Sequence, residues 1–62
     1  MAGERFVVEW GENYFLVFYD GDRIQWARGE ERAYRWTVRE RAESVRAELS
    51  KRYDDVKVRR TT

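Results

Sequence analysis

Six consecutive apolar residues, Tyr14-Phe15-Leu16-Val17-Phe18-Tyr19, lie between two turn-forming segments of a 62-residue chain. This run is far shorter than the roughly 20 residues that a membrane-spanning helix needs. Because successive side chains of a strand point to opposite faces, a strand with this sequence needs cover on both sides. We therefore expect residues 14–19 to form the central strand of a sheet, within a single domain that spans residues 1–62.

The segments on either side of this run are predicted to be its neighbouring strands. Residues 5–10 alternate between apolar and other side chains, which is the period of a half-buried strand. The Asp20-Gly21 pair favours a tight hairpin turn, because a type I′ turn needs positive φ at both positions. A third strand is then expected over residues 22–28.

The lengths of the two hairpin loops decide which side chains share a face. If both loops have two residues, one face holds the apolar core, which consists of Phe6, Val8, Trp10, Phe15, Val17, Ile24 and Trp26. A three-residue loop at positions 11–13 would instead move the apolar side of residues 5–10 to the opposite face. We rank the two-residue loop first.

The second half of the chain is predicted to supply one helix and a fourth strand. Thr37 and Glu40 have the spacing of a capping box, in which each side chain bonds to the backbone N–H of the other residue. Residues 38–53 then carry a single apolar stripe, as a helix packed on a sheet would. Residues 55–59 alternate as the last strand. If this strand lies beside the first and parallel to it, the strand order is 3-2-1-4.

Together these elements predict an α+β fold of order β-β-β-α-β, in which one helix packs on one face of a four-stranded, mostly antiparallel sheet. The other face then has no element to cover it. In the preferred register that face has an apolar centre and a charged rim, which is typical of a contact surface. We predict that it binds a partner through Tyr14, Leu16, Phe18, Val7, Arg5 and Arg23.

Two alternatives remain for this open face. A second copy of the chain is one occupant, because small domains often complete a core by pairing sheets back to back. The other alternative is that long rim side chains, such as those of Arg5 and Arg23, fold over the aromatic residues and hide them.

The residue types in the chain argue against catalysis. There is no cysteine and no histidine, so thiol, imidazole and metal–thiolate chemistry are excluded. The neighbouring carboxylates at 30–31 and 54–55 point apart in an extended chain, and no phosphate-binding loop or dinucleotide motif is present. We therefore expect no enzyme activity, no cofactor and no metal site.

Charge is distributed unevenly along the chain. Residues 1–31 carry three basic and seven acidic side chains, whereas residues 32–62 carry ten basic and five acidic ones. A basic half is compatible with an acidic partner or with nucleic acid. The nucleic-acid alternative would use Arg39, Arg46, Lys57, Arg59 and Arg60. Because charges of both signs alternate along the predicted helix, a solvated face is favoured over a phosphate-binding one.

The location of the protein follows from what its sequence lacks. No apolar stretch is long enough to cross a bilayer, and the first residues do not have the basic and then apolar pattern of a secretory signal. The absence of cysteine agrees with a reducing compartment. We expect a cytoplasmic protein without a membrane partner.

Several segments resemble those of short phage and prophage accessory proteins. These are Ala33-Tyr34-Arg35-Trp36-Thr37, Ala42-Glu43-Ser44-Val45 with the following Leu49, and Asp55-Val56-Lys57-Val58. Those proteins place an aromatic-rich hairpin before a helix that opens on Thr, and they end on a Val-x-Val strand. The resemblance implies a small protein that binds a larger host protein or complex and inhibits it, as anti-CRISPR proteins do.

A designed miniprotein without a function is the remaining alternative. The capping box and the Asp-Gly turn are both common design choices, and so is a sequence without histidine, cysteine or proline. The eleven arginines and three tryptophans argue against design, because designers usually avoid them.

Overall fold

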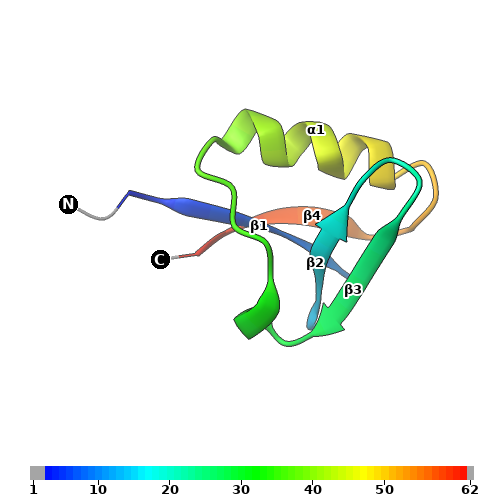
Figure 1. The fold of residues 1–62 in the computed structure, drawn as a ribbon, viewed down its shortest axis with the longest axis horizontal. Helices are drawn as coiled ribbons and strands as arrows, with labels where there is room; N and C mark the ends of the chain where they lie inside the picture. The colour runs from blue at the N-terminus through cyan, green and yellow to red at the C-terminus, as the bar shows by residue number, and fades with distance from the viewer. Residues whose placement is uncertain (1–2, 62) are drawn as a thin grey trace.

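The computed structural model describes residues 3–61. Its elements are β1 (Arg5–Trp10), β2 (Tyr14–Tyr19), β3 (Ile24–Arg28), the short 3-10 helix η1 (Glu30–Arg32), α1 (Arg39–Leu49) and β4 (Val56–Thr61). The strands form one sheet in the order β3-β2-β1-β4, and α1 packs on one of its faces (Figure 1). The predicted α+β fold and strand order are confirmed. β1 and β2 have the expected bounds, whereas β3 begins later and β4 ends later than expected.

β4 runs antiparallel to β1, so the expected parallel crossover is wrong. The segment that leads into α1 first returns along β1, where Trp36 pairs with Phe6 in an isolated antiparallel bridge. α1 then runs back toward the other end of β1, where the Gly11 N–H donates to the Asp55 carbonyl at 3.0 Å. The chain therefore enters β4 from the end at which β1 finishes, and all four strands are antiparallel.

The β1–β2 loop contains three residues, 11–13, so the preferred two-residue register is wrong and the alternative is correct. Trp10 pairs with Tyr14 across this loop. Asn13 has a φ of 69°, a left-handed conformation that asparagine tolerates better than most residues. Its backbone N–H donates to the Glu9 carboxylate at 2.9 Å, which ties the loop to the sheet.

The β2–β3 loop is also longer than predicted. It contains residues 20–23, and Tyr19 pairs with Ile24. The register then shifts by one residue between Leu16 and Phe18, which is a β-bulge. Because each residue of shift exchanges the two faces of a strand, the predicted division of β2 between the faces does not hold.

The helix-covered face of the sheet carries the main core. Three aromatic rings close one end of this core, with centroid distances of 4.9 Å between Trp10 and Tyr53 and 5.3 Å between Trp10 and Trp26. Such ring pairs add about 0.5–1.5 kcal/mol beyond the burial of their area. The buried members of the core are Phe6, Val8, Leu16, Ala42, Leu49 and Val56.

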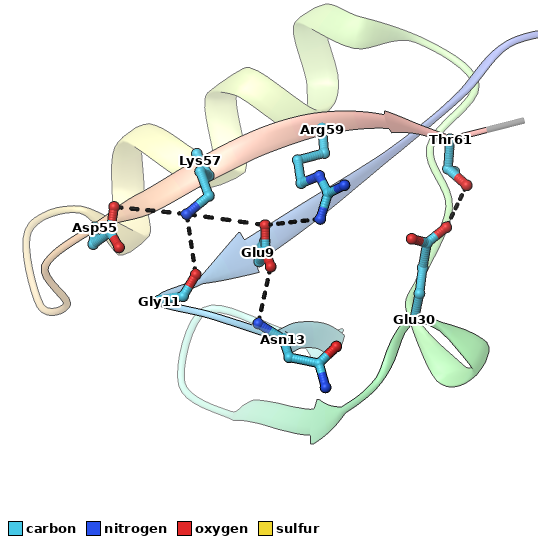
Figure 2. Close-up of polar contacts among 8 residues, drawn as sticks. All are labelled: Glu9, Gly11, Asn13, Glu30, Asp55, Lys57, Arg59 and Thr61. Atoms are coloured by element: carbon cyan, nitrogen blue, oxygen red, sulfur yellow. Dashed lines mark hydrogen bonds and ion pairs between the residues drawn. The ribbon is translucent and has the colours of Figure 1, made fainter.

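The opposite face is partly covered, contrary to the expectation that no element would reach it. Val7, Phe15 and Ala33 form a second buried cluster there. Ala33 directly follows η1, and the Thr61 hydroxyl donates to the carboxylate of Glu30 in η1, which joins η1 to β4 (Figure 2). The sheet is therefore enclosed by α1 on one side and, over part of its area, by the η1 segment on the other.

The predicted capping box does not form. α1 begins at Arg39 and ends at Leu49, with Val38 as its N-cap residue and no side chain bonded to the first N–H groups. Thr37 thus lies one residue before the cap, and Glu40 is one position too early in the first turn to complete the box. α1 is therefore shorter at both ends than the helix predicted for residues 38–53.

Candidate functional site

The structure does not bring the six predicted contact residues together. Leu16 is only 1% exposed and belongs to the core beneath α1, while Val7 is fully buried in the cluster on the opposite face. Tyr14 and Phe18 are 42% and 44% exposed, but they lie at opposite ends of β2. The longer loops and the bulge explain this division, because they reassign the faces of β1 and β2.

The two predicted rim arginines lie on different elements, and neither lines a surface shared with both exposed aromatic residues of β2 in the described sheet. Arg5 is the first residue of β1, and its guanidinium donates to the neighbouring Glu4 carbonyl at 3.2 Å. Arg23 lies in the loop between β2 and β3. A single aromatic patch with an arginine rim is therefore absent from the described sheet.

A different apolar site arises where β1 and β2 separate. β1 and β2 are paired only at the two residue pairs next to their loop, Glu9 with Phe15 and Trp10 with Tyr14. Beyond them, β1 bonds instead to the segment before α1: Phe6 and Trp36 exchange two backbone hydrogen bonds of 2.9 Å each. The Leu16 carbonyl accepts the Tyr34 N–H at 2.9 Å, and past this point β2 and the segment diverge (Figure 1). The divergence leaves a wedge beside α1.

An apolar groove of about 260 Å³ occupies this wedge. Its volume lies below the range of about 300–1,000 Å³ that is usual for small-molecule and cofactor sites. A groove of this size suits one or two side chains of a partner better than a cofactor. The lining residues, all apolar or aromatic, are Leu16, Val17, Phe18, Tyr19, Tyr34, Trp36 and Val45. We call this site the aromatic groove.

Three aromatic side chains make the aromatic groove accessible and ordered. Phe18 and Tyr34 are 44% and 53% exposed, which is high for residues of this size. The rings of Tyr34 and Trp36 meet edge to face, with centroids 4.6 Å apart and an interplanar angle of 69°. Because this contact already restrains both rings, a ligand would lose less side-chain entropy on binding them.

Two hollows adjoin the aromatic groove, and Trp36 lines all three spaces. The hollow on one side is lined by Trp36, Glu40, Arg41, Ser44 and Val45. The hollow on the other side, which we call the arginine hollow, is lined by Tyr34, Arg35, Trp36, Thr37, Val38 and Arg41. It is lined by two arginines and no acidic residue, whereas the aromatic groove has no charged lining residue.

Sequence reasoning did not identify Tyr34 and Trp36 as site residues. They stand in a short extended segment between a strand and a helix, where no long periodic pattern reveals their orientation. The alternation of two aromatic residues around Arg35 was the one available signal, because residues two apart in an extended chain point the same way. Their position depends on the bridge to Phe6, which is distant in sequence.

The basic residues named for nucleic-acid binding each have an acidic neighbour. On α1, Arg39 and Arg46 both pair with Glu43, at 3.7 and 2.9 Å. At the end of β4, Arg60 pairs with Glu4 at 2.9 Å. These groups are therefore not free cations on a common surface.

The other two basic residues, Lys57 and Arg59, belong to a network around Glu9 (Figure 2). Glu9 is only 5% exposed, and its carboxylate lies 3.2 Å from Arg59 and 3.9 Å from Lys57. The Lys57 ammonium also donates to the Gly11 carbonyl at 3.0 Å. A buried carboxylate needs such partners, because leaving it unpaired is costly. We assign this network a structural role, since it joins β4 to the end of β1 and to the loop that follows.

Two further findings bear on function. No group of three or more acidic side chains in residues 3–61 has an arrangement that could hold a metal ion. No helix in the same part of the chain combines the length and the apolar character that crossing a membrane requires.

Comparison with models of known protein families finds no match for this chain. Comparisons with curated proteins and with solved structures likewise find no match.

Proposed function

We propose that this chain is a non-catalytic protein-binding module, and that its aromatic groove receives an apolar side chain of a larger protein. The observation that carries the proposal is the convergence of Phe18, Tyr34 and Trp36 on one groove with an apolar floor. Tyr and Trp are enriched among the residues that dominate binding energy at protein interfaces. Contiguous exposed apolar surface on a small protein commonly marks such an interface.

The free energy that apolar burial in the groove can contribute is compatible with specific recognition. Burial of one large apolar side chain contributes about 1.5–3 kcal/mol. Binding would bury the exposed surface of Phe18 and Tyr34, which contributes part of this free energy. Burial of the partner's anchor side chain contributes the rest. The 260 Å³ groove limits the anchor to one or two side chains.

The finer proposal concerns the identity of the partner. The resemblance to phage accessory proteins supports a host protein or complex as the partner and inhibition as the consequence of binding. A second copy of the chain is the competing occupant, and sedimentation measurements distinguish the two. We expect a monomer, with self-association absent at concentrations where partner peptides bind.

The proposal is tested by selecting short random peptides, displayed on a surface, for binding to the wild-type chain. Peptides enriched in this way should bind Phe18→Asp at least about tenfold more weakly, a loss of about 1.4 kcal/mol. Tyr14→Asp is the matched control, because Tyr14 lies on the same strand and is almost equally exposed but does not line the groove. Enriched peptides should bind this variant as they bind the wild type.

Two outcomes would contradict the proposal. One is that no peptide is enriched, or that enriched peptides bind Phe18→Asp as tightly as the wild type. The other is that oligonucleotides bind instead, with an affinity that falls steeply with salt and does not depend on Phe18. Circular dichroism on both variants checks that each remains folded.

A further inference from the structure

We infer that the aromatic groove selects partner segments in which carboxylates lie next to the bulky apolar anchor. This inference rests on the proposed protein-binding function and adds the charge of the partner to it. The inference rests on a difference between arginines: Arg39 and Arg46 on α1 have an acidic partner, whereas Arg41 and Arg35, which lie near Trp36, have none within 4.0 Å in the described residues.

Arg41 is the arginine of α1 that lacks a counter-ion. Arg39 and Arg46 share the carboxylate of Glu43. In contrast, Arg41 has no acidic side chain within 4.0 Å in the part of the chain that the structure describes. Side chains three or four residues away are the ones that a helical residue can reach. The residues at those spacings from Arg41 are Val38, Ser44, Thr37 and Val45, and none of them is acidic.

Arg35, the second arginine of the arginine hollow, also has no acidic partner within 4.0 Å among the described residues. Arg35 donates to the carbonyls of Ala33 and Glu30, both at 3.4 Å. These contacts are long and their acceptors are neutral, so they position the side chain without neutralising it. Two arginines without an acidic partner in residues 3–61 therefore line one hollow that has no acidic lining residue.

The acidic side chain nearest in sequence does not compensate this charge. Glu40 precedes Arg41 and shares the hollow on the Ser44 side with it, but it forms no ion pair with Arg41 within 4.0 Å and does not line the arginine hollow. The two hollows beside the aromatic groove thus differ in charge: arginines alone are the charged lining residues on the side of Tyr34 and Thr37, whereas Arg41 is accompanied by Glu40 on the side of Ser44. A partner with a carboxylate on the side of Tyr34 and Thr37 would match this difference.

Trp36 connects the anchor position with the cationic position. Because it lines both the aromatic groove and the arginine hollow, a partner chain whose anchor fills the groove passes directly over Trp36 into the hollow. An extended chain advances about 3.3 Å per residue, so the carboxylate is expected within about one to three residues of the anchor. Arginine suits this role, since its planar fork binds a carboxylate through two parallel hydrogen bonds.

The test uses synthetic peptides with one central leucine or phenylalanine anchor. Their flanking residues are either Asp and Glu or the neutral amides Asn and Gln, and binding is followed by fluorescence anisotropy. The wild-type chain should bind the acidic peptide about tenfold more tightly than the amide peptide at low salt, and the preference should shrink as salt rises. Arg41→Glu should abolish or invert the preference.

Arg52→Glu is the matched control. Arg52 is exposed, follows the end of α1, lines neither the groove nor the hollows, and undergoes the same change of charge. It should retain the preference for the acidic peptide. Equal loss in both variants would show a general effect of net charge and would overturn the inference.

The remaining outcomes separate this inference from the proposed function. If the wild type binds acidic and amide peptides equally, the charge selectivity is wrong while the groove remains a protein-binding site. If neither peptide binds, or if both bind Phe18→Asp unchanged, the proposed function fails and the inference fails with it. If a single-stranded oligonucleotide displaces the acidic peptide at a lower concentration than the peptide itself, the ligand is nucleic acid and the inference is overturned.

Discussion

Glu9 joins three parts of the molecule through one carboxylate. It pairs with Arg59 at 3.2 Å and accepts the Asn13 N–H at 2.9 Å, so it connects β1, β4 and the loop between β1 and β2. The alternation of residues 5–10 placed Glu9 on the face opposite Trp10. It did not show that this carboxylate is buried, because the cover and the ionic partners come from residues far along the chain.

Replacement of Glu9 by Gln should lower the free energy of unfolding by about 1–2 kcal/mol. The figure is below that for a fully buried ion pair, because the Arg59 and Lys57 side chains are themselves about half exposed and water can solvate them. Urea denaturation measures the change. Glu12→Gln, in the exposed loop, should alter stability by less than about 0.5 kcal/mol. Equal stabilities for the two variants would contradict the structural role of Glu9.

At the scale of elements, the strands were predictable and their connections were not. β1 and β2 have the predicted bounds because alternation and apolar runs are local patterns. The three-residue β1–β2 loop contains a positive φ at Asn13, and a bulge in β2 shifts its register with β3; a sequence pattern does not reveal either feature. Because loop length and bulges both set the register, these two features explain why Leu16 lies in the core and Phe18 at the groove.

The start of α1 gives a test at this scale. Val38 occupies the N-cap position with φ of −114° and ψ of 119°, the extended conformation that a capping residue needs, but valine has no oxygen to accept an N–H. Val38→Ser should therefore stabilise the protein by about 1 kcal/mol in thermal or urea unfolding. Thr37→Ala should change stability by less than about 0.5 kcal/mol. A loss of about 1 kcal/mol in Thr37→Ala would instead support the capping box.

For the whole molecule, the aromatic groove is a product of tertiary structure. It exists because the segment before α1 leaves β2 after Tyr34 and pairs with Phe6, which brings β2, this segment and α1 around one space. The contact surface predicted from the sequence included Phe18, which is 44% exposed and lines the groove. The prediction missed Tyr34 and Trp36, because the bridge that positions them joins residues thirty positions apart.

Three tryptophans make the location of binding directly measurable. Trp36 lines the aromatic groove, whereas Trp10 and Trp26 contact each other in the core and do not line the groove. Nitrogen-15-labelled protein is titrated with a peptide selected on the wild-type chain, and the three indole N–H signals are followed by NMR. A large shift of the Trp36 signal, with those of Trp10 and Trp26 unchanged, is the result that we predict. Movement of the Trp10 or Trp26 signal while Trp36 stays still would contradict binding at the aromatic groove.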